Sequence, residues 1–188
     1  LIGAAVVYLA LAAALVRGLT NQRLNARAGL LAALLGALAI RVLLAFTVEG
    51  YGVDMGCFGA WAGKMAAGGP SNFYEAGYFC DYPPAYVYIM GLNAALMRVL
   101  PLSAAAVHKL IPMACDLAAA VLTYRIARKK NASANQAGIL MLLMAFNPAI
   151  FLNSAGWCQI DSVLSLLLML VAYFAVCGNW MAVMPIYM

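Results

Sequence analysis

Charged residues are scarce in this sequence. Only 9% of the 188 residues are Asp, Glu, Lys or Arg, whereas 67% are hydrophobic and the mean hydropathy is +0.94. A soluble domain has about a quarter charged and about half apolar residues. So few charges exclude a soluble enzyme, a disordered chain and a nucleic-acid-binding module, because each needs a charged, water-exposed surface. An integral membrane protein remains, for which lipid is the main solvent.

Residues that bind metals or form disulfides are also few. The chain has five Cys and one His, and none of them falls in a spacing typical of a metal site. Cys57 and Cys80 fall in one connection, where they could meet, but we expect both to remain free thiols. We accordingly expect no metal and no other cofactor.

Long apolar runs make up most of the sequence. About 20 apolar residues in a helix cross the hydrocarbon core of a bilayer, which is about 30 Å thick. We therefore expect an all-α fold, a polytopic bundle of transmembrane helices that forms the N-terminal part of one longer membrane domain. The predicted spans are residues 1–16, 28–48, 102–124, 136–152 and 162–177.

The basic residues predict the orientation of these spans. The net charge is +5, and Lys and Arg concentrate in the connector 17–27 and the run 125–130. Both segments should be cytoplasmic by the positive-inside rule. The connections 49–101 and 153–161 are then outside the cell. This arrangement holds only if the apolar segment 85–100 does not cross the membrane, so we expect a re-entrant or interfacial helix there.

The outer connection 49–101 is unusually long for a loop, which suggests a function. It contains four of the six acidic residues of the chain. Apolar residues at helical spacing from Met55 to Met65 predict a short helix over 54–67 that lies on the membrane surface. Asp54 stands where it could cap this helix.

Three acidic residues define a candidate site on the outer side. Asp54 and Asp81 belong to the first outer connection, and Asp161 lies in the second, at the mouth of a span. A carboxylate there could take a proton from a hydroxyl nucleophile within hydrogen-bond reach. Each residue also has a structural interpretation: Asp54 and Asp161 as helix caps, and Asp81 as a turn residue. The substrate that suits this place is amphipathic, with a lipid tail and a polar head.

Ionisable residues also fall inside the predicted spans. Arg41 lies in one span, and Lys109 and Asp116, seven residues apart, share a face of another. A charge that faces lipid is costly, so such residues usually face a cavity or a partner. Arg41 and Lys109 could offset a phosphate charge, or Lys109 and Asp116 could form a structural pair. Aromatic residues of the outer connection, Trp61 among them, suit an interfacial belt or a sugar-binding platform.

Ordered motifs in both outer connections resemble the polytopic glycosyltransferases of the GT-C superfamily. Residues 52–62, 73–74 and 81–86, the last reading Asp-Tyr-Pro-Pro-Ala-Tyr, look like the first outer loop of that superfamily. Residues 147–162 look like its second outer loop, and residues 109–125 are similar to the span between them. The nearest look-alikes are bacterial relatives of the dolichyl-phosphate-glucose and dolichyl-phosphate-mannose transferases.

The resemblance implies an inverting transfer of a monosaccharide from a polyprenyl-phosphate carrier to a hydroxyl of a glycan or protein acceptor, on the outer face of a bacterial cytoplasmic membrane. By position, Asp54 is the general base, and Asp81, Gln159 and Asp161 line the cavity. Cys158 stands where the superfamily often has Gly. The resemblance also implies a phosphate-binding cation from a C-terminal half, so we expect this fragment to be inactive alone. The candidate substrate-binding residues are Asp81, Tyr82, Gln159, Asp161, Lys109, Arg41 and Trp61.

A polytopic transporter or lipid flippase is the second hypothesis, with Arg41, Lys109 and Asp116 lining a path. It explains the charges inside the spans but not the long aromatic and acidic outer connection, and the chain has no repeated halves with paired broken helices. The expected partners are the bilayer, the lipid-linked donor and the acceptor, and not nucleic acid. The sequence specifies neither the sugar nor the acceptor.

Overall fold

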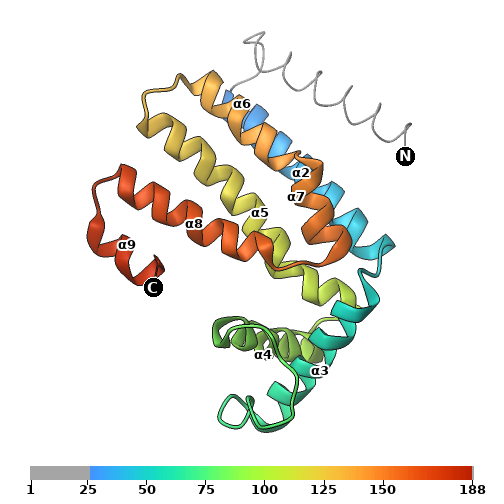
Figure 1. Cartoon of the computed structure of the whole chain (residues 1–188). Coiled ribbons are helices and arrows are strands. Elements are labelled where there is room, and N and C mark those ends of the chain that lie inside the picture. The colour runs from blue at the N-terminus through green and yellow to red at the C-terminus, as the bar shows by residue number, and fades with distance from the viewer. Residues whose placement is uncertain (1–25, 188) are drawn as a thin grey trace.

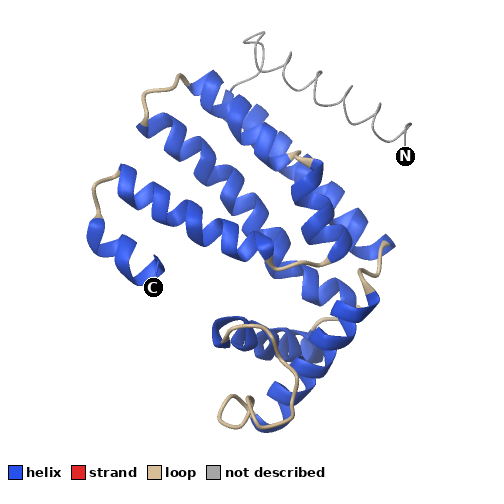
Figure 2. Cartoon of the chain, in the orientation of Figure 1, coloured by secondary structure: helices blue, strands red, loops and turns tan. Residues whose placement is uncertain are grey.

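The computed structural model describes residues 26–187, and every regular element in that range is helical. The predicted span 1–16 lies outside the described residues. The expected all-α class is confirmed for the described part. Figure 2 shows helices joined by mostly short connections, with a longer loop after the second of them. The elements are α2 (Ala26–Thr47), α3 (Gly52–Gly68), α4 (Pro84–Val99), α5 (Ala104–Lys129), α6 (Ala134–Ala145), α7 (Pro148–Phe151), the π-helix η1 (Leu152–Trp157), α8 (Asp161–Val176) and α9 (Trp180–Tyr187).

Three helices of the described chain are long and apolar enough to cross a membrane. They coincide with the predicted spans 28–48, 102–124 and 136–152, because a run of apolar residues of that length is visible in sequence. The predicted span 162–177 forms α8, an apolar helix that is shorter than the other three. The three long segments are Ala28–Thr47, Ala104–Lys129 and Ala134–Trp157.

The helix α5 is central to the arrangement. It packs along α6 on one side and α8 on the other, while α2 packs on α5 and α6 (Figure 1). Small side chains allow the close approach of these helices, since Ala37, Ala120 and Ala145 are fully buried where α2, α5 and α6 meet. The connection from α5 to α6 and the start of α2 lie together at one end of the molecule (Figure 1).

The helices α3 and α4 lie together at the opposite end, where α2 ends and α5 begins (Figure 1). The sequence fixes their limits locally. Gly69, with a φ of 66°, ends α3, and Pro84 occupies the first turn of α4, where a missing N–H costs nothing. Ser103 then begins α5, because its side chain accepts a hydrogen bond from the N–H of Ala106 at 3.2 Å.

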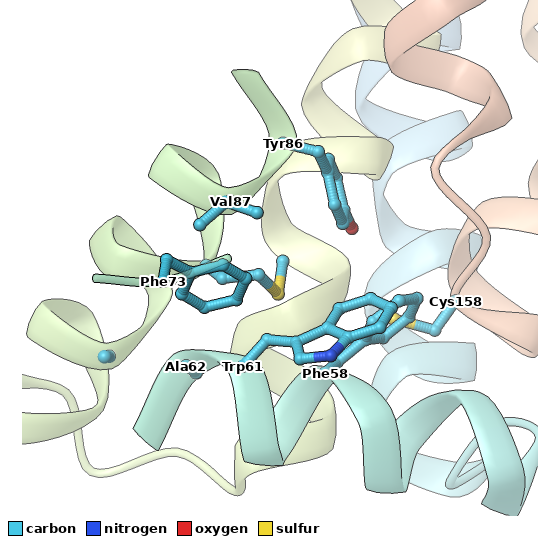
Figure 3. Close-up of a cluster of buried hydrophobic side chains, with 9 residues drawn as sticks. Phe58, Trp61, Ala62, Phe73, Tyr86, Val87 and Cys158 are labelled. Carbon is cyan, nitrogen blue, oxygen red and sulfur yellow. The ribbon is translucent and has the colours of Figure 1, made fainter. Parts of the chain in front are cut away.

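An aromatic core holds α3 and α4 together. Figure 3 shows Phe58 and Trp61 of α3 facing Tyr86 of α4, with Phe73 entering from the loop and Cys158 from the segment after η1. All five side chains are buried. The pair α3 and α4 is therefore attached by its core to Cys158, which follows η1 and lies 59 residues beyond the end of α4.

Candidate functional site

The Asp54 carboxylate is held by side chains from a distant part of the chain. Its Oδ2 oxygen accepts a hydrogen bond from the indole Nε1 of Trp157, at 3.2 Å, and another from the amide Nε2 of Gln159. These partners are 103 and 105 residues away in sequence. Asp54 does not cap α3, because the N-cap is Tyr51 and Asp54 lies within the first turn. The first predicted outer connection thus meets the second at this carboxylate.

The π-helix η1 and the turn after it place the two donors. A π-helix is rare and is frequently found at functional sites. Here it ends at Cys158, whose φ of 74° is left-handed, and the backbone N–H groups of Cys158 and Gln159 both donate to the carbonyl of Asn153. This tight turn brings the side chains of Trp157 and Gln159 to the same carboxylate oxygen.

A glycine allows the two connections to touch. Gly50 has a φ of 102°, and a Cβ added there would lie 3.1 Å from the carbonyl oxygen of Trp157. The next N–H, of Tyr51, donates to that same carbonyl at 3.4 Å, and the rings of Tyr51 and Trp157 lie 5.6 Å apart. Only glycine combines this φ with this close approach, so Gly50, two residues before α3, helps to fix Asp54.

Tyr82 senses the charges of all three candidate carboxylates. Burial raises the pKa of Tyr82, and the negative charges of Asp54, Asp81 and Asp161 raise it further. A phenol in this setting stays protonated at neutral pH and can donate a hydrogen bond to a bound group. The charges of Asp54, Asp81 and Asp161 thus all act on this one phenol.

The ring of Tyr82 rests on the aromatic core. Its centroid lies 5.1 Å from that of Trp61 and 5.1 Å from that of Tyr86. Trp61 is buried, and its Nε1 donates to the carbonyl of Phe79 at 2.9 Å. Trp61 is thus placed neither in a lipid-facing belt nor on an open platform. Its ring packs against the ring of Tyr82 within the core.

A cavity of about 190 Å³, with both polar and apolar lining residues, adjoins Asp161. Asp161 is the first residue of α8 and makes no capping hydrogen bond, and its Oδ2 accepts from the Nδ2 of Asn153 at 3.2 Å. Two other oxygens of the lining residues, Oδ1 of Asn153 and Oδ1 of Asp116, are buried and have no hydrogen-bond partner among the described residues. With the hydroxyls of Ser162 and Ser165, the lining is rich in acceptors and suits a ligand that carries hydroxyl groups.

Arg41 and Asp116 form a buried ion pair. The Nε of Arg41 lies 3.1 Å from Oδ2 of Asp116, and its Nη1 donates to the carbonyl of Ala145 at 2.9 Å. The hydroxyl of Ser154, in η1, also donates to Oδ2 of Asp116. The network thus ties α2 and α5 to η1, the element that positions the donors to Asp54.

Of the alternatives left open for Lys109 and Asp116, the structural pair is absent among the described contacts. Lys109 does share a helix face with Asp116, and both are buried, but the Nζ of Lys109 donates to the carbonyl of Val48 at the end of α2. Terminal carbonyls of a helix lack intrahelical partners and attract cations. Arg41 and Lys109 are both 0% exposed, so the structure places neither at the surface beside Asp54.

An apolar groove of about 330 Å³ runs beside the Asp54 contact. Its lining includes Leu44 of α2, Val48 just after α2, Leu152, Tyr51 and Trp157, and Trp157 is the residue that donates to Asp54. Trp157 therefore links the proposed carboxylate site to an apolar groove.

Within residues 26–187, no three His, Cys, Asp or Glu side chains come together in a way that could hold a metal ion. Cys57 and Cys80 are free thiols, as expected.

Comparison of the chain with protein-family models, curated proteins and solved structures gives no match. A functional assignment therefore depends on the residues that resemble GT-C motifs and on the geometry of the site.

Sequence reasoning missed several residues that shape the site. Trp157 stood inside a quoted motif but was given no role, and Asn153 and Ser154 were given none either. The sequence feature that could have indicated these residues is the polar composition of 153–161, which lies between two apolar runs. No sequence pattern marks a π-helix, so the meeting of Trp157 with Asp54 could not be foreseen.

Proposed function

We propose that this chain belongs to a membrane glycosyltransferase of the GT-C type. The enzyme transfers a monosaccharide from a polyprenyl-phosphate carrier to an acceptor hydroxyl on the outer face of the membrane. The observation that carries this proposal is the Asp54 carboxylate, which Trp157 and Gln159 hold by hydrogen bonds and whose charge, like those of Asp81 and Asp161, raises the pKa of Tyr82.

The geometry of Asp54 supports the role of general base. Both hydrogen bonds fall on Oδ2, and Oδ1 accepts none from the residues that the structure describes. Oδ1 can therefore take the proton of an acceptor hydroxyl. The acceptor oxygen then bonds to the anomeric carbon from the side opposite the carrier, the bond from that carbon to the phosphate oxygen breaks, and polyprenyl phosphate leaves.

The surfaces around Asp54 suit an amphipathic donor. The groove lined by Leu44, Val48 and Leu152 can take part of a polyprenyl chain, because all three residues are apolar. The cavity beside Asp161 offers buried oxygens that can accept from sugar hydroxyls. The element η1 connects these surfaces, because its Trp157 lines the groove and donates to Asp54, and its Asn153 lines the cavity and donates to Asp161.

The position of α4 supports an outer location of the site. In Figure 1 this helix lies beside α3 at one end of the molecule, and it does not run along α2, α6 or α8. The proposed topology keeps α3 and α4 on the outer surface as interfacial helices. The basic end of α5, with Arg125 and Arg128, then lies on the cytoplasmic side, in agreement with the positive-inside rule.

The geometry favours a transferase over a transporter. A path for ions or lipid needs charges that face open space. Arg41 and Asp116 instead form a buried ion pair with one another, and Lys109 donates to the carbonyl of Val48 at a helix end. In the described part of the chain, these three residues are 0 to 2% exposed.

The decisive experiment replaces Asp54 by Asn in the full-length protein and measures transfer of sugar from a polyprenyl-phosphate donor. We expect turnover to fall by at least about 100-fold, the usual contribution of a general base, with donor binding retained. Glu75→Gln is the matched control, because Glu75 lies in the same connection but pairs with Lys64 at the surface. Normal turnover of Asp54→Asn would remove Asp54 from the base role, and turnover lost equally in both variants would indicate damage to the fold.

A further inference from the structure

Two concave surfaces at the end of the molecule away from Asp54 share one residue, Arg125. The first is an apolar groove of about 520 Å³ between α2, α5 and α8. Leu34 and Leu38 line it from α2, Val121 from α5 and Leu166 from α8, and Arg125 is the one charged residue in its lining.

The second surface is a basic hollow of about 380 Å³ at the C-terminal end of α5. Arg125, Arg128 and Lys129 line it, and Tyr124 and Tyr173 complete it. Neither lining contains an acidic residue. The hollow therefore presents three cations and two phenolic hydroxyls, all hydrogen-bond donors, to whatever enters it.

The groove and the hollow form one continuous surface because Arg125 belongs to both. Along α5 the apolar part runs from Leu117 to Arg125, a rise of about 12 Å at 1.5 Å per residue. A ligand that fills both must have an apolar chain and an anionic group at its end.

We propose that this surface binds one anionic phospholipid, with an acyl chain in the groove and its phosphate beside Arg125. Arg125 and Lys129 make no side-chain hydrogen bond or ion pair within the residues that the structure describes, and Arg128 uses Nη1 to donate to the carbonyl of Ala132 at 2.9 Å. Free donors thus surround the phosphate position. Anionic lipids concentrate in the cytoplasmic leaflet, the side that the basic residues predict for this end. The inference does not depend on glycosyl transfer.

Basic residues at a helix C-terminus have another explanation, since they offset the negative end of the helix dipole. That effect needs no apolar groove leading to Arg125 and no tyrosines beside it. Exposed leucines in the groove point instead to a chain-bearing ligand, because Leu35 and Leu38 are 57% and 37% exposed although they line a concave surface.

The test measures lipid retention by native mass spectrometry of the detergent-solubilised full-length protein. The probes are phosphatidylglycerol, phosphatidylcholine and inorganic phosphate. We expect phosphatidylglycerol to be retained in preference to phosphatidylcholine, and inorganic phosphate not to displace it, because the acyl chain contributes to binding. Equal retention of the two lipids, or displacement by inorganic phosphate, would overturn the proposal.

Variants locate the bound lipid. Arg125→Gln should weaken retention of phosphatidylglycerol about fivefold, the effect of one cation near an anionic lipid, and Arg125→Lys should restore most of it. Ala118→Phe fills the groove and should weaken retention to a similar degree or more. Arg98→Gln is the matched control, because Arg98 is an exposed arginine on α4 at the other end of the molecule.

The double variant Arg125→Gln/Ala118→Phe asks whether one molecule occupies both surfaces. Contacts to a single lipid weaken one binding event, so the double variant should lose about the product of the two single losses. Two retained lipids, of which each single variant removes a different one, or an equal loss in Arg98→Gln, would overturn the proposal. Far-ultraviolet circular dichroism of each variant establishes that the helices are intact.

Discussion

The side-chain amide of Gln159 donates a hydrogen bond to the Oδ2 oxygen of Asp54 across 105 residues of sequence. Trp157 donates to the same oxygen, so two side chains from one short turn set the direction in which the carboxylate points. Gly50 permits the contact, because the backbone beside it bonds to the carbonyl of Trp157. The orientation of the proposed base therefore depends on η1 and the turn after it as well as on α3, the helix that contains Asp54.

Replacing Gln159 by Glu should impair the proposed transferase more than it impairs folding. The substitution removes a donor to Asp54 and places a second carboxylate beside it. Two neighbouring carboxylates hold a proton more tightly, so the acidic limb of the kcat/KM profile should move to higher pH and activity at neutral pH should fall at least about tenfold. The measurement is kcat/KM against pH with a polyprenyl-phosphate donor.

The same substitution at Gln136 is the control. Gln136 lies in the capping box of α6, at the other end of the molecule, where a Glu is equally well accommodated. Gln136→Glu should keep the wild-type profile. An unchanged acidic limb in Gln159→Glu would mean that the contact with Asp54 has no part in the reaction.

Tyr82 provides a spectroscopic test of the convergence of the carboxylates. Burial and then the charges of Asp54, Asp81 and Asp161 raise its pKa, so Asp54→Asn should lower that pKa, whereas Glu75→Gln should leave it in place. The titration can be followed by the 13Cζ resonances of labelled tyrosines, with Tyr82→Phe to assign the signal. If the pKa of Tyr82 is the same in Asp54→Asn as in the wild type, the two residues do not lie close enough to interact.

The removal of the Tyr82 hydroxyl separates its chemical role from its packing role. Tyr82→Phe keeps the ring against Trp61 and Tyr86, so we expect the free energy of unfolding to change by less than about 1 kcal/mol. If the hydroxyl donates to bound substrate, turnover falls about tenfold, the usual effect of one lost hydrogen bond in a site. Turnover equal to wild type would leave the hydroxyl without a role in the reaction.

The helices could be predicted because their signals are local. Hydropathy alone located α2 and α5, and the length of apolar sequence bounded them within a few residues. The pattern from Met55 to Met65 likewise indicated α3. Such signals depend on the composition of each segment and on nothing far away in the chain.

The partners of the buried charges could not be predicted, because pairing is a tertiary property. Spacing put Lys109 and Asp116 on one face, and this favoured a pair within α5. Asp116 instead pairs with Arg41, 75 residues earlier, since the bundle brings α2 against that face, and Lys109 finds the end of α2. The partners of Asp54 could not be predicted for the same reason. The sequence indicated that Asp54 belongs to an outer connection, but its hydrogen-bond donors, Trp157 and Gln159, meet it only in the folded chain.

The ion pair of Arg41 and Asp116 should show strong coupling in stability. Asp116→Ala leaves the guanidinium of Arg41 buried without its counter-charge, which costs about 3–5 kcal/mol. Replacing both residues, as Arg41→Met/Asp116→Leu, should cost much less, because no uncompensated charge remains. Thermal unfolding in detergent, followed by circular dichroism, measures both. Equal losses in the single and double variants would mean that the pair does not act as a unit.

The native cysteines can test the proposed topology. Cys80 lies in the loop before α4 and Cys177 at the end of α8, at opposite ends of the molecule, so a membrane-impermeant maleimide should label them from opposite sides. Cys158 should resist labelling from either side, because it is fully buried and burial raises its pKa to about 12, which leaves almost no reactive thiolate. Single-cysteine variants that contain only Cys80 or only Cys177, in sealed vesicles of known orientation, provide the measurement. Labelling of both from the same side would mean that α4 crosses the bilayer, and the proposed outer location of α3 and α4 would be lost.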